Sequence, residues 1–465
     1  MKMLICGEWV DTKRKIKVTN PFNNEIIDTV PMATIEHVKK AISEAASYDY
    51  SLTAWERYEI LNKFSYLLQK HRDEFIELIS KESGKPIKES VIEVERAYQT
   101  FLISAEEAKR INGEILPIDA IKGFPKRLAL VIREPIGIVV AITPFNYPLN
   151  LVAHKVGPAI AANNPVVLKP SSLTPLTALK MAELFLEAGL PAKMLHVITG
   201  DSKEIGDELI LNPLVQKITF TGSVKVGKNI CQKVGMKKIC MELGGNDPLI
   251  VLKDADVKKA VSCAVIGAFG NNGQRCTSIK RIIIENSIAD QFIELFIEKT
   301  KILKIGNQMD PSTDIGPLIS EEAAKEIENR VNIAIAKGAK LLYGGKRKGA
   351  IYWPTVLDFV EPQNPIVVKE TFGPIAPFIR VKNFDEAIEV ANMTSYGLQA
   401  GIFTNDLEKA IEAAKKIQAG AVIINDGPGF RAEHIPFGGV KDSGLGREGV
   451  RYAVNEMTRL KTIVI

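Results

Sequence analysis

Short apolar strands alternate with helices over residues 137–242, and this alternation is the feature that most constrains the fold. The predicted strands are 137–142, 166–168, 194–198, 217–220 and 238–241, and the predicted helices between them are 151–162, 175–187, 204–209 and 224–234. Short apolar strands joined by helices form parallel sheets with right-handed crossovers. The segment therefore predicts an α/β domain of the nucleotide-binding type.

The regions on either side predict further α/β structure. Residues 34–112 have mostly helical spacing of their apolar residues, and residues 127–133 have the composition of a strand. A second series of strands and helices runs from residue 249 to residue 425. A predicted strand over 460–465 ends the chain and needs an edge to pair with, which a partner subunit can supply. A chain of 465 residues exceeds the size of one core, so we expect two or more domains.

Charge and composition exclude several classes of function. The net charge is +5, from 60 basic and 55 acidic residues that are interleaved along the chain. This balance is too weak to indicate binding to nucleic acid or to a membrane surface, and no apolar run reaches the ~18–20 residues that cross a bilayer. The five cysteines form no Cys-x-x-Cys pair, and the five histidines lack metal-ligand spacing. We therefore expect no disulfide, no metal site and a reducing, cytoplasmic location.

A cysteine stands in the polar loop Gly273-Gln274-Arg275-Cys276-Thr277-Ser278. Turn-forming residues precede it and Arg275 lies beside it, which predicts an exposed, electropositive thiol that favours the nucleophilic thiolate. The alternative is an inert cysteine that packs as a small hydrophobe. That alternative fits Cys240 and Cys263 better than it fits Cys276, whose neighbours are polar.

A function of a different class is also open. The segment from Gly222 to Asn229 nearly spells a phosphate-binding P-loop between a strand and a helix, but Asn229 stands where a Mg²⁺-binding Ser or Thr is required. A phosphotransferase is therefore an alternative, although it leaves Cys276 without a role. The simpler interpretation is a tight turn before a helix whose N-terminus suits an anion.

Six short segments follow predicted strands or carry the thiol, in a fixed order. They are Thr143–Pro148, Lys169–Ser172, Phe220–Ser223, Met241–Asn246, Gln274–Cys276 and Lys369–Pro374. Together this ordered set resembles the NAD(P)-dependent aldehyde dehydrogenase superfamily from end to end. The resemblance implies an α/β fold with a Rossmann-like cofactor domain, an α/β catalytic domain and a small β oligomerisation element. By resemblance these are residues 1–116 with 136–244, residues 245–445, and residues 117–135 with 446–465, in a homodimer or homotetramer.

The resemblance also implies a reaction and its residues. Cys276 resembles the nucleophile, and the Asn146 amide with the Cys276 backbone N–H resembles the oxyanion hole. Glu242 resembles the general base that activates water to hydrolyse the thioester, with a pKa raised by burial. Without the resemblance, Asn146 is simply a turn residue and Glu242 a surface carboxylate.

NADP or NAD is the implied cofactor. The residues that resemble its binding site are Thr143, Pro144, Phe145, Lys169, Ser171, Ser172, Gly222, Ser223, Gly227, Leu243, Glu370 and Phe372. Among these, Lys169 and Glu370 resemble the ribose ligands. Members that prefer NAD often carry Glu where this chain has Ser172, so nothing here repels a 2′-phosphate and we expect NADP to be accepted.

The implied substrate is a small polar aldehyde. The residues expected to shape its pocket are Tyr147, Arg275, Arg431, His434 and Phe437. The arginines and the histidine suit a hydroxyl, carboxylate or phosphate group on the substrate. The chain looks most like family members that oxidise lactaldehyde or, without phosphorylation, glyceraldehyde 3-phosphate; succinate semialdehyde and phosphonoacetaldehyde are alternatives.

Overall fold

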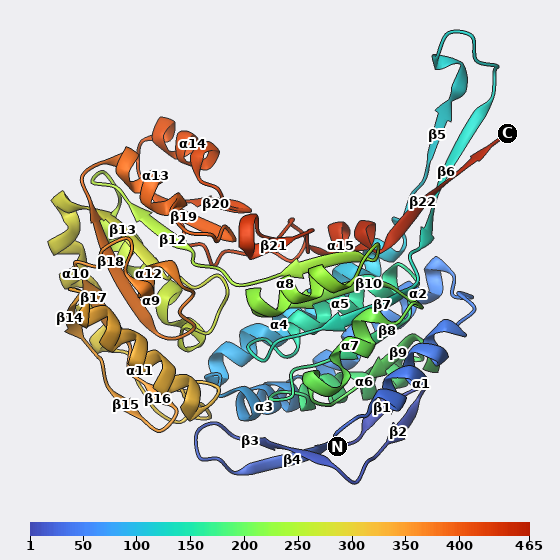
Figure 1. Ribbon diagram of the computed structural model, residues 1–465, viewed down its shortest axis with the longest axis horizontal. Coiled ribbons are helices and arrows are strands. Elements are labelled where there is room, and N and C mark those ends of the chain that lie inside the picture. The colour runs from blue at the N-terminus through green and yellow to red at the C-terminus, as the bar shows by residue number, and fades with distance from the viewer.

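Two sheets form the centres of two lobes that lie side by side, and a small third sheet projects from one lobe as an arm (Figure 1). The computed structural model describes all residues, from Met1 to Ile465. The two main sheets have eight and seven strands, and the arm has three. No helix is long and apolar enough to cross a membrane.

The first lobe contains the predicted parallel sheet. Its central strands are β9 (Leu195–Val197), β8 (Val166–Lys169), β7 (Ile138–Ile142), β10 (Val215–Thr221) and β11 (Lys238–Glu242), in that spatial order. The connecting helices are α5 (Asn150–Ala161), α6 (Leu176–Ala188), α7 (Ser202–Leu211) and α8 (Val224–Lys233). All neighbouring pairs among these strands are parallel, which confirms the prediction. The strand order reverses between β7 and β10, as in a Rossmann-type sheet.

Antiparallel strands at the edges of this sheet were not predicted. They are β1 (Met3–Ile5) and β2 (Glu8–Val10) at one edge and β21 (Gly444–Leu445) at the other. Segments of two or three residues are too short to display a strand period, so only their long-range partners define them. A separate hairpin consists of β3 (Lys15–Thr19) and β4 (Ile26–Pro31).

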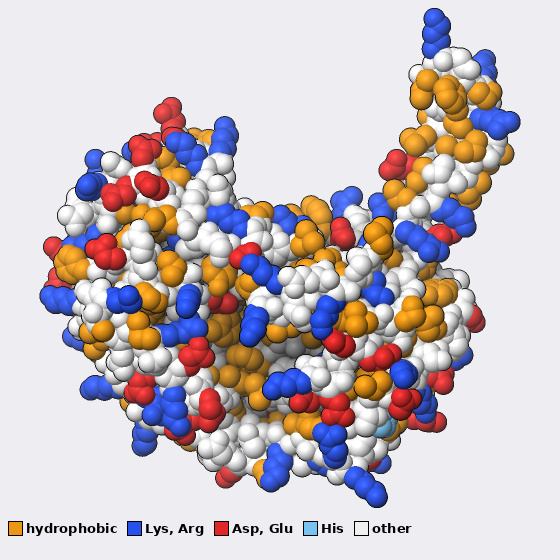
Figure 2. All heavy atoms as spheres, in the orientation of Figure 1, with side chains coloured by type: hydrophobic (Ala, Val, Ile, Leu, Met, Phe, Trp, Pro, Cys, Tyr) orange, Lys and Arg blue, Asp and Glu red, His pale blue; other side chains and the backbone are white.

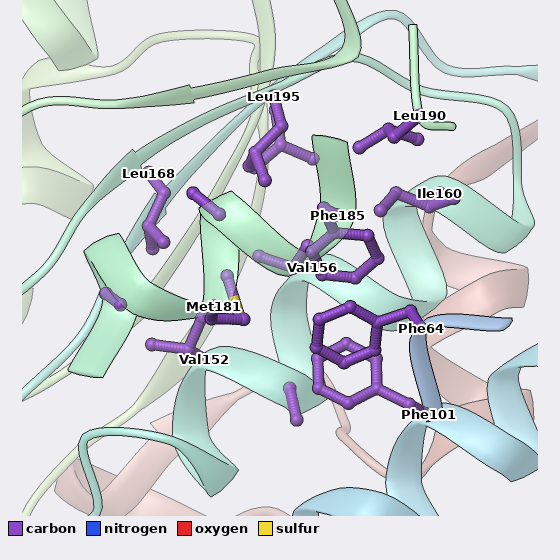
Figure 3. Packing of buried hydrophobic residues seen from close by; sticks show 14 of the residues in the cluster. Phe64, Phe101, Val152, Val156, Ile160, Leu168, Met181, Phe185, Leu190 and Leu195 are labelled. Carbon is purple, nitrogen blue, oxygen red and sulfur yellow. The ribbon is translucent and has the colours of Figure 1, made fainter. Parts of the chain in front are cut away.

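Residues 34–112 are helical, as predicted. The helices are α1 (Ile35–Ala46), α2 (Ala54–Lys70), α3 (Arg72–Ser83) and α4 (Ile87–Ala108). Phe64 of α2 stacks on Phe185 of α6 with ring centroids 3.8 Å apart, and Phe101 of α4 meets Phe64 edge to face (Figure 3). These rings and the side chains of α5 form the largest apolar cluster. The cluster fixes α5 and therefore the turn that leads from β7 into it.

The second lobe has the sheet order β14-β17-β18-β13-β12-β19-β20. Its strands are β12 (Pro248–Val251), β13 (Arg281–Glu285), β14 (Lys340–Tyr343), β17 (Thr355–Asp358), β18 (Ile375–Val381), β19 (Gln399–Phe403) and β20 (Ala421–Ile424), with the hairpin β15 (Arg347–Lys348) and β16 (Ile351–Tyr352) beside them. Its helices are α9 (Val257–Phe269), α10 (Asn286–Lys301), α11 (Glu321–Ala336), α12 (Pro365–Val368), α13 (Phe384–Asn392) and α14 (Leu407–Lys416). Helix α14 was not predicted; its buried residues are the small side chains Ala410 and Ala413.

The arm consists of β5 (Glu114–Pro117), β6 (Leu128–Pro135) and β22 (Thr458–Val464). Strand β22 pairs antiparallel with β6 from Thr458 opposite Pro135 to Val464 opposite Ala129. The edge for the last strand therefore comes from the same chain, which corrects the expectation that a partner subunit supplies it. Before it enters the arm, the chain forms α15 (Val450–Glu456), which packs on α4 and α5.

Candidate active site

A cavity of about 300 Å³ opens where the strand order of the first sheet reverses. Figure 2 shows the molecular surface hollowed between the two lobes, with hydrophobic side chains in the hollow. The predicted cofactor residues that line the cavity are Pro144, Phe145, Gly222, Ser223, Leu243, Glu370 and Phe372. They follow β7, β10 and β11 in the first lobe or come from the second lobe, so the fold gathers segments that are far apart in sequence.

The other predicted cofactor residues do not line this cavity. Ser172 donates a hydrogen bond through its hydroxyl to the carbonyl of Gly200 at 2.8 Å, and Ser171 accepts one from the backbone of Leu173. Lys169 ends β8, is buried, and has its Nζ 3.3 Å from the carbonyl of Pro170. Burial lowers the pKa of Lys169 to about 8, against the opposing effect of Asp201.

Two further predicted cofactor residues, Thr143 and Gly227, do not line the cavity either. Thr143 donates its backbone N–H to the carbonyl of Lys169 at 3.2 Å, and its buried hydroxyl has no partner. Gly227 lies under Leu243, because a Cβ at this glycine would come within 2.4 Å of a Leu243 methyl carbon. Helix α8 therefore approaches the cavity closely.

The cavity suits a dinucleotide. The Glu370 carboxylate lies against Gly244, where a Cβ would come within 2.2 Å of its Oε2, so only glycine leaves room for it. The N-terminus of α8 follows the Gly222 turn, and its amide dipoles favour a phosphate group. The hydroxyl of Thr221 lines the cavity, is buried, and has no protein partner. A carboxylate, an anion-favouring helix end and an unpartnered hydroxyl match the groups of a nicotinamide dinucleotide.

Cys276 lies where this cavity meets a second pocket, since both are lined by Cys276 and Leu151. Cys276 is half-buried, so its thiol is less exposed than predicted. Burial raises the pKa of Cys276 to about 11, although the positive charge of Lys280 opposes the rise. The neighbouring Arg275 directs its guanidinium to the carbonyls of Ile266 and Gly267, each at 2.9 Å. The prediction of a free thiolate in the cofactor-free protein is therefore wrong, because the polar loop is covered by surrounding segments of the fold.

Asn146 holds the turn after β7 against the loop of Cys276. Its buried side-chain amide donates to the carbonyl of Gln274 at 2.9 Å, and Asn271 donates to the carbonyl of Asn146 at 3.2 Å. An amide has two N–H donors, so one remains for a ligand. The backbone N–H of Cys276 forms no hydrogen bond with another protein group.

Glu242 ends β11 and is buried. Neither of its carboxylate oxygens has a hydrogen-bond partner. Burial and the nearby charge of Glu448 raise the pKa of Glu242 well above its usual range, although Arg431 and Lys155 oppose the rise. Glu242 lines neither pocket and stands one residue before Leu243, which lines the cofactor cavity.

The second pocket contains most of the predicted substrate residues. Tyr147, Arg275, Arg431 and Phe437 line it together with Cys276. His434 does not line it and is exposed at the surface.

Arg96 also lines the second pocket, and no sequence pattern indicated this role. It belongs to α4, where it is one of many charged residues, and only the fold brings it near the thiol. Its Nε donates to Glu433 at 2.6 Å. Arg431 in turn donates to Glu448 at 3.1 Å and lies 3.8 Å over the ring of Phe437.

The P-loop candidate has no support from the geometry. Lys228 is partly exposed and pairs with Asp442 at 2.7 Å. It lines neither pocket.

The chain is similar to known proteins along its whole length. The model of the aldehyde dehydrogenase family matches residues 9–463. The chain is 46% identical to 3-sulfolactaldehyde dehydrogenase from Priestia aryabhattai, over 100% of this chain and 97% of that protein. It is 44% identical to lactaldehyde dehydrogenase from Methanocaldococcus jannaschii, over 100% of both chains. Among solved structures, NADP-dependent glyceraldehyde-3-phosphate dehydrogenase from Bacillus halodurans, complexed with NADP, superposes with a TM-score of 0.98 at 40% identity, over 100% of this chain and 98% of that chain.

Proposed function

Because this chain belongs to the aldehyde dehydrogenase family and oxidises aldehydes with NAD(P), we propose that its preferred substrate is a short hydroxyaldehyde that carries an anionic group. The relatives named for sulfolactaldehyde and glyceraldehyde 3-phosphate support an anionic hydroxyaldehyde. The relative named for lactaldehyde, which is uncharged, supports only the short hydroxyaldehyde part of the proposal. Because the chain belongs to this family, the phosphotransferase alternative no longer applies.

The arginines of the second pocket carry this proposal. Arg96 and Arg431 are each paired with a buried glutamate, whereas Arg275 donates only to backbone carbonyls and forms no ion pair. Its charge therefore remains available beside Cys276, where a guanidinium can bind a sulfonate, phosphate or carboxylate with two parallel hydrogen bonds.

Three other residues, Cys276, Asn146 and Glu242, support a covalent mechanism. The thiolate form of Cys276 attacks the aldehyde carbon, and the negative charge moves to the former carbonyl oxygen, where it is stabilised by the free N–H of the Asn146 amide and by the Cys276 backbone N–H. NAD(P), when bound, supplies the nicotinamide ring that accepts the hydride, which leaves a thioester on Cys276. Glu242 then takes a proton from water so that the water hydrolyses the thioester.

NADP is the cofactor we expect this chain to accept readily, alongside NAD. Ser172 places no negative charge beside the expected 2′-phosphate, and Lys169 lies close by in sequence. The buried Lys169 ammonium has only one carbonyl partner, so it retains donors for the ribose.

We propose a homodimer or homotetramer that assembles through the arm. Exposed apolar side chains lie along all its strands and its loop, namely Ile115, Leu116, Phe124, Leu128, Ile132, Leu460, Ile463 and Val464. Such a patch is typical of an interaction site. With this arm taken as the oligomerisation element, the first lobe is the cofactor domain and the second the catalytic domain. The cysteines are all unpaired, which supports a reducing, cytoplasmic location.

A panel of aldehydes, assayed with NADP and with NAD, tests the substrate proposal. The panel contains glyceraldehyde 3-phosphate, 3-sulfolactaldehyde, lactaldehyde, succinate semialdehyde and phosphonoacetaldehyde, with propanal as the uncharged, unhydroxylated control. We expect the highest kcat/KM for a hydroxyaldehyde that bears phosphate or sulfonate. Equal kcat/KM for propanal would contradict the proposed role of the arginines.

A further inference from the structure

Lys280 lies behind the wall of the cofactor cavity, and no step of the proposed mechanism uses it. It directly precedes β13, and its side chain is 2% exposed. Its ammonium donates to the carbonyl of Gly245, the carbonyl of Cys276 and Oε1 of Glu370, each at 2.9 Å. Since an ammonium has three donors, every one is used within the protein.

The three acceptors belong to three different parts of the proposed site. Cys276 is the proposed nucleophile, and Glu370 is the carboxylate that faces the cofactor cavity. Gly245 lies on the loop that follows Glu242, and its own N–H donates to Glu370 at 3.2 Å. One buried ammonium therefore ties the nucleophile loop, the loop of the proposed base and the cofactor carboxylate together.

This arrangement fixes the backbone around the thiol. The carbonyl of Cys276 is held by Lys280, while the carbonyl of Gln274 is held by Asn146. The carbonyls of Gln274 and of Cys276 itself flank the peptide that contains the Cys276 N–H, so these two contacts restrict the orientation of this N–H, which has no protein acceptor. Removal of the ammonium would free one of these two anchors.

The arrangement also sets the charge around the thiol. After burial, Lys280 has the largest effect on the pKa of Cys276 and lowers it, whereas Asp247 and Glu370 raise it. The two ends of the Lys280–Glu370 ion pair therefore act on the thiol in opposite directions. Uncharged side chains that only filled this space would not shift the pKa of Cys276 in opposite directions.

We propose that Lys280 is a positioning residue that couples Glu370, the carboxylate facing the cofactor cavity, to the nucleophile loop. The two opposite charges of this ion pair together control the reactivity of Cys276. The proposal rests on the proposed roles of Cys276 and Glu370. It concerns the thiol before any substrate binds, so it is measurable without turnover.

The test is the rate of alkylation of Cys276 by iodoacetamide in the full-length, cofactor-free protein between pH 7 and pH 10. The modified peptide is quantified by mass spectrometry, because the exposed Cys231 also reacts. The variants are K280M, K280R and E370Q. K217M is the matched control, since Lys217 is equally buried (1% exposed) but pairs with Glu456 outside the site.

We expect K280M to slow alkylation about tenfold at each pH, because loss of a nearby positive charge raises a thiol pKa by about one unit or more. E370Q should accelerate alkylation, K280R should stay within about threefold of wild type since it keeps the charge, and K217M should have no effect. Unchanged rates in both K280M and E370Q, or a change in the same direction in both, would overturn the proposal. If K280M does not fold, an unaccelerated E370Q overturns it alone. Absence of aldehyde oxidation by the wild type would instead refute the proposed function.

Discussion

The side-chain amide of Asn146 donates to the backbone carbonyl of Gln274 at 2.9 Å, so the turn after β7 is joined directly to the loop that carries Cys276. The second N–H of the same amide is free to bind a substrate oxygen. One contact thus connects the lobe that holds the cofactor cavity to the segment that carries the thiol.

Replacement of Asn146 by Ala should lower kcat by ~10²–10³-fold, because it removes one donor to the developing oxyanion. The affinity for NADP, measured by fluorescence titration, should change little, since the cavity wall keeps its other residues. Asn62, which is exposed on α2, provides the control N62A. A kcat for N146A within a few-fold of wild type would exclude Asn146 from the oxyanion hole.

The cofactor-free thiol should titrate far above neutrality. Because burial raises the pKa of Cys276 to about 11, the thiol is mostly protonated below that pH and reacts only through its small thiolate fraction. The rate of Cys276 alkylation by iodoacetamide in the wild type should therefore rise about tenfold per pH unit from pH 7 to pH 10, since the thiolate is the nucleophile. An alkylation rate of Cys276 that is already constant from pH 7 upward would contradict a thiol with a raised pKa.

The parallel sheet and the thiol could be predicted from the sequence, because local patterns determine both. Strands such as 166–168 are wholly apolar runs beside helices, and Cys276 stands out among polar neighbours. The order of segments predicted ligand-binding residues at the ends of β7, β8, β10 and β11, and the cavity is lined by residues that follow β7, β10 and β11.

Residues that act only through long-range contacts could not be predicted. Arg96 on α4 and Lys280 before β13 reach the site through tertiary packing, and their sequence neighbours give no indication of it. The partial burial of Cys276 was not predicted for the same reason, because composition describes a loop but not what covers it. His434 followed the same apparent logic as Arg431, yet the loop directs it away from the pocket.

Replacement of Arg275 by Met should reduce kcat/KM for glyceraldehyde 3-phosphate by about 10–100-fold, the range for loss of a hydrogen bond to a charged group. Oxidation of propanal should stay within a few-fold of wild type, because propanal has no anion for Arg275 to bind. R14M, which alters an exposed arginine, is the control. Equal losses for both aldehydes would mean that Arg275 only supports the loop.

Replacement of Ser172 by Glu should shift the cofactor preference toward NAD. A carboxylate at this position would repel a 2′-phosphate, so kcat/KM for NADP should fall about tenfold or more. The kcat/KM for NAD should stay the same or rise. Steady-state kinetics with both cofactors give the ratio of kcat/KM for NADP to kcat/KM for NAD. The S171E variant tests whether any nearby negative charge lowers this ratio. An unchanged ratio in S172E would contradict the proposed role of this position.

The central claim is that Cys276 forms the thioester and that Glu242 is needed to hydrolyse it. The most direct test is to mix the E242Q variant with NADP and the best aldehyde of the panel, then measure the burst of NADPH and the mass of the Cys276 peptide. We predict one NADPH per active subunit, slow turnover afterwards, and an acyl group on Cys276 alone. No burst together with an unmodified Cys276 peptide, or an acyl group on another residue, would contradict the account.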